Sequence, residues 1–503
     1  MSLLGIDVGT TGCKACAFTP EGTLIASAYR EYDIMRPRPG WAELDTQAVL
    51  RDVKSAIAET AAQCRRDPVS ALAVSSLGEA VVPVARDGTI LGNSILNFDE
   101  RGAEYVRRFA DLCDNDRLYR INGNTLGNHY SLTKLLWIRD ALPDVYERTF
   151  KVLHWGAFVG FMLGAAPVVD FSLANRTLLF DLDAGDWSPE LASAAGIDRD
   201  KLPDTAPSGT AIGKVSVAAA GELGLPPGVT VVTGAHDQCA NALGCGVVDA
   251  GCAMFGMGTY FCITPVFRAR REPAEMIPRG LNTEHHAVPG CFVTFLYNHG
   301  GSLLKWYRET FAAREHAEAA RTGEDLYAQL IREIPEDPST VLVLPHFAPT
   351  GPPEFVSDSS GVLIGLRLET TRGDILKGIL EGVVFYLREC LDAAESAGIR
   401  VSDFRAVGGG SKSDAWLQIS ADILGRPLTR PRLAEAGALG SAILAGAATG
   451  VFDSAVAGAE ATVRVDRCFD PDASRHAAYT TRYEQYQRIW PLMKDYLRNV
   501  QQK

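Results

Sequence analysis

The stretch that decides the fold lies near the N-terminus and reads Gly5-Ile6-Asp7-Val8-Gly9-Thr10-Thr11-Gly12-Cys13-Lys14. It continues an apolar run that begins at Leu3 and carries one acid near its end. Glycines and threonines then interrupt the run, and apolar residues resume up to Phe18. Short apolar runs separated by glycine-rich turns are typical of β-hairpins. The stretch therefore predicts two antiparallel strands joined by a tight turn.

The same hairpin carries the residue types that bind phosphate. Backbone N–H groups in a tight glycine turn can converge on a phosphate oxygen. Thr10 and Thr11 add hydroxyl donors, and Lys14 adds positive charge. Asp7, near the end of the first strand, is a ligand type that magnesium accepts directly or through water. The alternative is an ordinary turn with a strand acid facing solvent. The pattern favours a phosphate site with Asp7 as the metal ligand.

The second half of the chain repeats this order. Residues 252–264 read as strand, glycine turn and strand around Gly256-Met257-Gly258-Thr259. Strands and helices alternate along the chain, which indicates the α/β class. Two similar lobes are therefore expected, over 1–247 and 248–455, followed by a polar helical tail over 456–503. Alone, the second hairpin would be an ordinary turn, but the pair predicts two loops facing one triphosphate across a cleft.

A candidate general base follows a β-branched strand over 229–233. The triplet His236-Asp237-Gln238 comes next and leads into a helix of small residues. An aspartate at the carboxyl edge of a strand can accept the proton of a substrate hydroxyl as that oxygen attacks phosphorus. Asp is also a favoured helix N-cap, and without the other motifs that interpretation would prevail. Together with the two glycine hairpins, the triplet favours Asp237 as the catalytic base.

A third glycine loop, Gly408-Gly409-Gly410-Ser411-Lys412-Ser413, follows a predicted strand and opens a predicted helix. It loosely resembles the dinucleotide fingerprint, but the third glycine of that pattern is missing. A glycine loop at a helix start can equally bed an adenosine. The GxxxxGK[ST] pattern is absent, which argues against a P-loop enzyme.

Composition narrows the class of protein. The chain has 503 residues, 47% hydrophobic and 22% charged, an ordinary globular balance for about two or three domains. A net charge of −12 disfavours nucleic acid and membrane surfaces as partners. Eleven scattered cysteines and no cationic leader favour the cytoplasm. The apolar run over 153–169 is short and interrupted, so we expect a buried helix rather than a membrane span.

In this order and spacing the loops resemble those of the FGGY family of carbohydrate kinases, which includes glycerol kinase, xylulokinase and gluconokinase. The resemblance extends from Leu3 to about Phe452. It implies two ribonuclease H-like lobes of the actin and hexokinase type, with ATP and sugar meeting in the cleft between them. It also implies ATP and Mg²⁺ as cofactors.

The resemblance carries over residue by residue. The family's Asp-x-Gly-Thr-Thr hairpin matches Asp7 to Thr11, and its base matches Asp237, with His236 in place of the common glycine. Lys14 stands where glycerol kinase has an arginine, which keeps the charge but loses the forked geometry. The positions implied to bind nucleotide are Gly9, Thr10, Thr11, Lys14, Gly258, Thr259, Gly301, Gly408, Gly409, Gly410 and Ser413, with Asp7 at the metal.

The resemblance is weaker at the substrate. The positions that it implies are Glu79, Asp99, Arg101, His129, Asp237 and Gln238. Glycerol kinase has Gln-Arg-Glu where this chain has Leu77-Gly78-Glu79, so the arginine is lost, and the Gln-Met-His stretch of xylulokinases is absent as well. Phe98 replaces a usual tryptophan, and a glycerol kinase tyrosine falls at His129. The pocket matches neither relative and leaves the sugar open.

These residues predict an ATP-dependent kinase acting on a hydroxyl of a small sugar or polyol, with ketopentoses and four- or five-carbon polyols favoured. The alternative is an actin-like ATPase or nucleotide-dependent binding protein without sugar kinase activity, because the same lobes serve such proteins. The polar set around Glu79, Asp99 and Asp237 favours the kinase. A homodimer is suggested by the resemblance alone.

Overall fold

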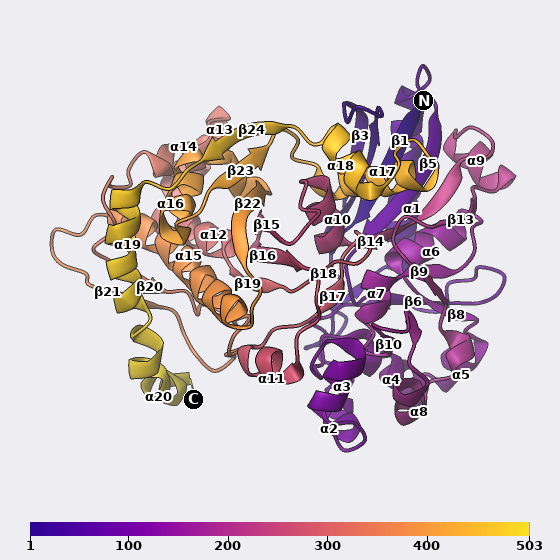
Figure 1. Ribbon diagram of the computed structural model, residues 1–503, viewed down its shortest axis with the longest axis horizontal. Helices are drawn as coiled ribbons and strands as arrows, with labels where there is room; N and C mark the ends of the chain where they lie inside the picture. The colour runs from indigo at the N-terminus through magenta and orange to yellow at the C-terminus, as the bar shows by residue number, and fades with distance from the viewer. Residues whose placement is uncertain (502–503) are drawn as a thin grey trace.

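The structure, a computed structural model, describes residues 1–501 and is built on two separate β-sheets (Figure 1). The first sheet has six strands, in the order β13 (Ala211–Lys214), β14 (Thr230–His236), β5 (Val69–Ser76), β1 (Ser2–Val8), β2 (Gly12–Phe18) and β3 (Leu24–Glu31). β1, β2 and β3 pair antiparallel, whereas β1, β5 and β14 pair parallel. The predicted N-terminal hairpin is confirmed as β1 and β2.

The second sheet has eight strands and follows the same plan. Its order is β17 (Glu284–His285), β18 (Phe292–Val293), β16 (Tyr260–Phe267), β15 (Gly251–Met257), β22 (Val401–Val407), β23 (Leu428–Pro431) and β24 (Val465–Phe469), with β19 (Leu296–His299) also on β16. β15 pairs antiparallel with β16 and parallel with β22, as β1 does with β2 and β5. The second predicted hairpin and the α/β class are thus confirmed.

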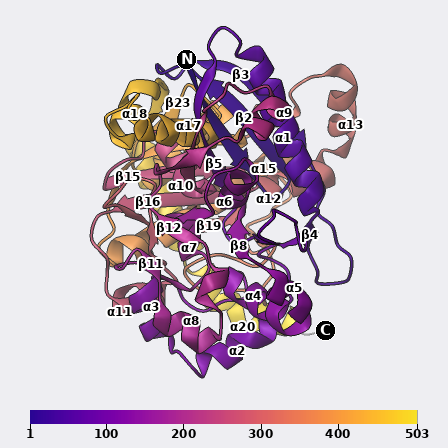
Figure 2. The same cartoon turned by 90° about the vertical axis from the view of Figure 1, so that its right-hand side faces the viewer.

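The two faces of the first sheet are covered by different parts of the chain. Alternate strand residues point to opposite faces. Leu4 and Ile6 of β1 pack with helix α1 (Thr46–Gln63), which lies over β2 and β3 (Figure 2). Leu3 of the same strand packs with two other helices, α10 (Asp237–Gly244) and α17 (Ala436–Ala448). Asp7 shares the odd-numbered face with Leu3, so its side chain is directed toward α10 and α17.

Helix α17 comes from near the C-terminal end of the chain, yet it lies against the first sheet (Figure 1). It can do so because glycines remove side chains along its path. A Cβ added to Gly5 of β1 would stand 1.7 Å from the Ala438 carbonyl oxygen. One added to Gly244 would stand 1.8 Å from the Ala436 oxygen, and one at Gly440 would stand 2.0 Å from the Ala240 oxygen. Backbone-to-backbone packing therefore joins the two ends of the chain.

Segments in the last third of the chain do not all pack against the sheet that their place in the sequence suggests. The predicted lobe limits, 1–247 and 248–455, follow chain order and stay a prediction. In space, α17 and the following helix α18 (Ala455–Thr462) lie with the first sheet. The tail predicted as helical over 456–503 begins inside α18 and then adds β24 to the second sheet. It then forms α19 (Ala473–Tyr486) and α20 (Ile489–Gln501). Among the described helices, none is long and apolar enough to cross a membrane.

The close approach of α17 to β1 makes a testable prediction for stability. Gly5→Ala places a methyl group inside the Ala438 carbonyl, so we expect a loss of about 3 kcal/mol and a lower melting temperature. The matched control is Gly221→Ala in helix α9 (Val217–Leu223), where an added Cβ meets nothing within 4 Å. It should raise stability by up to about 1 kcal/mol. Equal effects of the two changes on thermal unfolding would contradict this account.

Candidate functional site

The first glycine hairpin places its turn at the end of β1. The Gly9 N–H donates to the Gly12 carbonyl at 2.9 Å, and the Tyr32 hydroxyl donates to the Gly9 carbonyl at 2.7 Å. Thr10 is half-buried and Thr11 is exposed. Lys14 forms an ion pair with Glu435, the residue that precedes α17. Its predicted role toward phosphate thus requires it to share its charge with that carboxylate.

The second hairpin and the Gly408–Gly410 loop lie together. Gly258 and Thr259 are exposed at the turn between β15 and β16. A Cβ on Gly408 or Gly410 would stand within 3.0 Å of Met257 in the same hairpin, whereas one on Gly409 would meet nothing within 4 Å. Gly408 and Gly410 are therefore required by packing, and Gly409 faces open space. Its missing side chain leaves room for a ligand.

Two other residues predicted to bind the nucleotide have clear structural roles. Gly301 begins helix α12 (Gly301–Phe311), and a Cβ there would stand 2.4 Å from the Gly258 carbonyl oxygen. It seats the helix on the second hairpin. Ser413 caps helix α16 (Asp414–Leu424), because its hydroxyl accepts from the Trp416 N–H at 3.3 Å. Both residues shape the loops, and their contact with nucleotide stays a prediction.

Asp7 occupies an acidic position suited to a cation. Ser75 Oγ donates to Asp7 Oδ1 at 2.8 Å. Burial, followed by the charge of Asp237, raises the pKa of Asp7 to about 7. Opposite it, Gly437 of α17 leaves space, because an added Cβ there would stand 3.1 Å from Asp7 Oδ2. A carboxylate that is desolvated, adjoins a second carboxylate and keeps one oxygen clear fits the hard oxygen ligands that Mg²⁺ takes.

Asp237 lies where the sequence predicts a base. It is the first residue of α10, directly after β14, and its side chain is 25% exposed. The N-cap of α10 is His236, without a side-chain capping bond, so Asp237 does not serve as the cap. Burial and the charge of Glu79 raise the pKa of Asp237, while His236 opposes the rise. Gln238 lies beside it, and its polar groups also oppose the rise in the pKa of Asp237.

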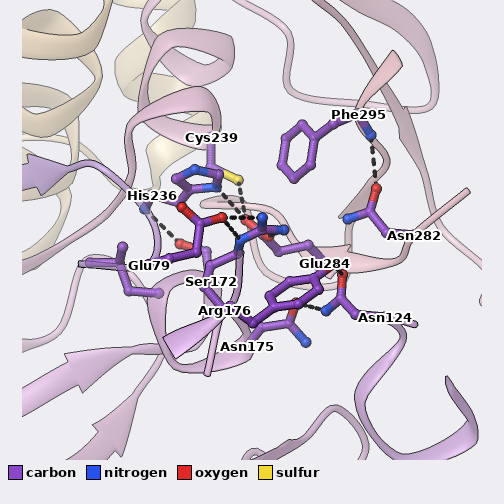
Figure 3. Close-up of polar contacts among 12 residues, drawn as sticks. Glu79, Asn124, Ser172, Asn175, Arg176, His236, Cys239, Asn282, Glu284 and Phe295 are labelled. Carbon is purple, nitrogen blue, oxygen red and sulfur yellow. Dashed lines mark hydrogen bonds and ion pairs between the residues drawn. The ribbon is translucent and has the colours of Figure 1, made fainter. Parts of the chain in front are cut away.

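A chain of buried charges of alternating sign runs from Glu79 through Arg176 and Glu284 to His236 (Figure 3). It ends at the partly exposed Asp237. Arg176 donates from Nε to Glu79 Oε1 at 2.9 Å and pairs with Glu284 Oε2 at 3.3 Å. His236 Nδ1 donates to Glu284 Oε1 at 2.7 Å, and its Nε2 lies 3.3 Å from Asp237 Oδ1. Glu284 belongs to β17 of the second sheet, so this chain of charges joins both halves of the molecule.

Polar and aromatic residues surround this chain of charges. The rings of His129 and Tyr130 lie 4.0 Å apart, and Arg176 lies over the Tyr130 ring at 4.8 Å. Burial, then the Arg176 charge, lowers the pKa of His129 to about 4, so its imidazole is neutral at ordinary pH. The Tyr130 hydroxyl donates to Asn124 Oδ1 at 2.8 Å. His129 thus lies near Glu79, as the substrate prediction requires.

Asp99 and Arg101 form a separate buried cluster. Asp99 Oδ1 accepts from the Arg101 N–H and Nε, and its Oδ2 accepts from Arg101 Nη2 and the Ala42 N–H. Arg101 also donates to Glu43 at 2.7 Å and lies over the Trp41 ring at 3.9 Å. Burial would raise the pKa of Asp99, but these bonds hold it below its usual range. With both carboxylate oxygens used, the pair is better suited to scaffolding than to substrate contact.

Sequence reasoning missed Arg176 and Glu284. Arg176 donates to Glu79 Oε1 from both Nε and Nη2, although the two residues lie about a hundred positions apart in the sequence. Glu284 is completely buried. Neither residue belongs to a glycine loop or an apolar period, so no local pattern marks them. The one available signal concerns Arg176, a charged residue that directly follows the mostly apolar and small residues of α7 (Phe171–Asn175).

Comparison with known proteins identifies the two halves. Residues 2–244 match the family model described as "FGGY family of carbohydrate kinases, N-terminal domain", and residues 272–449 match the corresponding C-terminal domain. The chain is similar to the xylulose kinase of Bacillus subtilis (strain 168), with 26% identity covering 98% of this chain and 97% of that protein. It is 30% identical to the glycerol kinase of Stenotrophomonas maltophilia (strain K279a), over 93% of this chain and 94% of that protein.

A solved structure shows the same fold. The crystal structure of xylulose kinase from Rhodospirillum rubrum superposes with a TM-score of 0.87 at 26% identity, and the match covers 99% of this chain and 100% of that one. The similarity spans both sheets and the helices that join them. The expected pair of actin- and hexokinase-like lobes is thereby confirmed.

The contacts of Asp99 and Glu79 predict different kinetic effects. Asp99→Asn disturbs a closed buried ion pair, so we expect a loss of about 3 kcal/mol in stability and a sugar KM within about 2-fold of the wild type. Within residues 1–501, both hydrogen bonds from Arg176 to Glu79 go to Oε1, which leaves Oε2 for a ligand. Glu79→Gln should therefore raise the sugar KM about 10-fold. A comparable rise in KM for Asp99→Asn would show that Asp99 contacts the sugar.

Proposed function

Because the chain belongs to the FGGY family of carbohydrate kinases, we propose that it transfers the γ-phosphoryl group of ATP to one hydroxyl of a ketopentose or of a four- or five-carbon polyol. The observation that carries the proposal is the proximity of Asp7 and Asp237 at the carboxyl ends of β1 and β14, the two strands on either side of β5 in one sheet. One carboxylate there suits a metal, and the other suits a substrate hydroxyl. The glycine hairpins supply the phosphate cradles.

The proposed reaction is a direct transfer. The substrate hydroxyl oxygen attacks the γ-phosphorus, the bond from that phosphorus to the bridging oxygen breaks, and ADP leaves. The hydroxyl proton passes to the carboxylate of Asp237. The position of Asp237 supports this role, because its side chain is partly exposed, lies near Asp7 and does not cap helix α10. Exclusion of water would prevent ATP hydrolysis.

For the nucleotide, we propose that the turn at Thr10 and the turn at Thr259 hold the phosphates and that the open space at Gly409 takes the nucleoside. Asp7 would hold Mg²⁺, which neutralises phosphate charge when it is bound. The support is the burial of Asp7, the nearby negative charge of Asp237 and the space left by Gly437. Because Lys14 pairs with Glu435, only part of its positive charge would act on the phosphates.

For the acceptor, we propose that Glu79, His129 and Gln238 contact the sugar beside Asp237, and that Asp99 and Arg101 hold the wall behind it. Charged and neutral hydrogen-bonding groups suit a polyhydroxylated molecule. The names of the xylulose kinase relatives support a ketopentose, whereas that of the glycerol kinase relative supports a polyol. A location in the cytoplasm is proposed on the eleven scattered cysteines.

The proposed function is tested by a coupled assay of ADP release across ketoses, aldoses, alditols and sugar acids. A kinase should show sugar-dependent release with at least one ketopentose or short polyol. Steady ATP hydrolysis that no member of the panel stimulates would instead favour the actin-like ATPase. Product analysis by mass, an increase of one phosphoryl group, separates transfer from hydrolysis.

Asp237→Asn gives the sharpest prediction for catalysis. The amide keeps the shape of the side chain but cannot accept the proton, so we expect kcat to fall by roughly 100-fold or more. The KM for ATP and the melting temperature should stay close to those of the wild type. Near-normal turnover of the best substrate by this variant would exclude Asp237 as the base.

A further inference from the structure

We propose that His236 is a positioning residue for phosphoryl transfer: its imidazole, held by Glu284 of the second sheet, fixes the carboxylate of Asp237 in the orientation that accepts the substrate proton. This inference rests on the proposed function. It assigns a role to a side chain outside the glycine loops, at a position where the family resemblance has a glycine. It also makes a residue of the second half a determinant of the base in the first.

Contacts at both ring nitrogens and with one aromatic ring hold the imidazole of His236. Nδ1 donates to Glu284 Oε1 at 2.7 Å, and Nε2 lies 3.3 Å from Asp237 Oδ1, so each ring nitrogen has an acidic partner. The Phe295 ring lies edge-on at 5.3 Å between centroids. The backbone N–H of His236 donates to Ser172 Oγ at 2.8 Å. A ring held at both nitrogens and on one face can hold its neighbour in one rotamer.

Gly78 provides the space that this ring occupies. A Cβ at residue 78 would stand 2.9 Å from His236 Nε2, the nitrogen that faces Asp237, and 3.4 Å from Arg176 Cγ. Any side chain there would push the imidazole away from the base. The glycine at 78 and the histidine at 236 are therefore mutually dependent, although they lie on segments far apart in the sequence.

The charges around His236 favour its protonated form. Burial alone would lower its pKa, but the carboxylates of Glu284 and then Asp237 outweigh burial and raise the pKa to about 9. The titratable and charged groups that face it from the neighbouring segments are Glu79, His154, Asp170, Arg176, Asp237, Cys239 and Glu284. His154, with a pKa lowered to about 3, is neutral. The imidazolium is thus present below about pH 9 and is lost above it.

A buried metal is the competing explanation, because His236, Cys239 and Glu284 offer ligand atoms within 4.8 Å of one another. Two observations oppose a metal at this position. The Arg176 guanidinium already pairs with Glu284 at 3.3 Å and would repel a cation. Burial and the Glu284 charge also raise the pKa of the Cys239 thiol, which disfavours the thiolate that a metal would need. The experiment below separates the two explanations.

Two substitutions of the same residue test the role of each ring nitrogen. His236→Asn keeps a donor near Nδ1, toward Glu284, and removes the group that faces Asp237. His236→Gln places a donor near Nε2, toward Asp237, and gives up the contact with Glu284. The positioning role predicts that kcat falls between about 10- and 100-fold in His236→Asn and stays within about 5-fold in His236→Gln, with the KM for ATP unchanged in both. A purely structural role predicts the reverse order, because the Glu284 contact is the better buried of the two.

The pH profile adds a readout that fold stability does not move. In the wild type kcat should decline above about pH 9, as the imidazolium is lost. Glu284→Gln removes the carboxylate that raises the pKa most, so the decline should shift to lower pH. In His236→Gln it should disappear. These measurements hold even where His236→Asn fails to fold, which its melting curve reveals.

Cys239→Ala serves as the matched control, since it alters the same cluster without touching either ring nitrogen. We expect its kcat to remain within about 2-fold of the wild type. A loss equal to that of His236→Asn, with sensitivity to a chelator at saturating Mg²⁺, would replace the positioning role by a metal site.

Gly78→Ala tests the mutual dependence with His236. It should lower kcat in the wild type and have no further effect in the His236→Asn background, because the imidazole that it displaces is already absent. Additive losses would contradict the proposal. So would a wild-type kcat in His236→Asn or an unshifted pH profile in Glu284→Gln. If the wild type phosphorylates no sugar, the proposed function fails first; with an active wild type these outcomes bear on His236 alone.

Discussion

The structure depends on the direct contact of α17 with β1 and α10. Helices and strands usually meet through side chains, at axis separations of 8–10 Å for helix pairs. Here glycines at positions 5, 244 and 440 let backbone press against backbone, and a methyl group at any of them would overlap a carbonyl. The contact carries Glu435 to Lys14 and Gly437 to Asp7. The acidic centre of the site is therefore assembled from both ends of the chain.

A second constraint is electrostatic. Glu79, Arg176, Glu284, His236 and Asp237 bring alternating charges into a region largely shielded from water. Such a network contributes little net stability, since desolvation offsets attraction, yet losing one of its buried members, Glu79, Arg176 or Glu284, leaves a partner unpaired at a cost of about 3–5 kcal/mol. What the network provides is geometry. Each group has few orientations that satisfy both neighbours. The orientation of the Asp237 carboxylate, at the exposed end, is restricted in the same way.

The sequence was informative where function depends on local backbone shape. Both glycine hairpins, the α/β class and the place of Asp237 after β14 could be predicted, because turns and strand ends leave a signature within about ten residues. Asp99 and Arg101 were placed at the substrate by resemblance, but their hydrogen bonds close on each other and on Glu43. Arg176 and Glu284 could not be found, since a pair formed across a hundred residues has no local pattern. The place of α17 against the first sheet had none either.

The origin of α17 has a consequence for synthesis. One face of the first sheet, including Leu3, Ala71, Ala73 and Val232, is completed only by residues from 436 onward. At roughly 5–20 residues per second, a ribosome needs on the order of 10–40 seconds to extend the chain from the end of α10 to α17. During that interval the nascent N-terminal half carries an apolar face that lacks the cover of α17. The emerging chain is thus exposed to aggregation and is a natural client for chaperones until its C-terminal segment arrives.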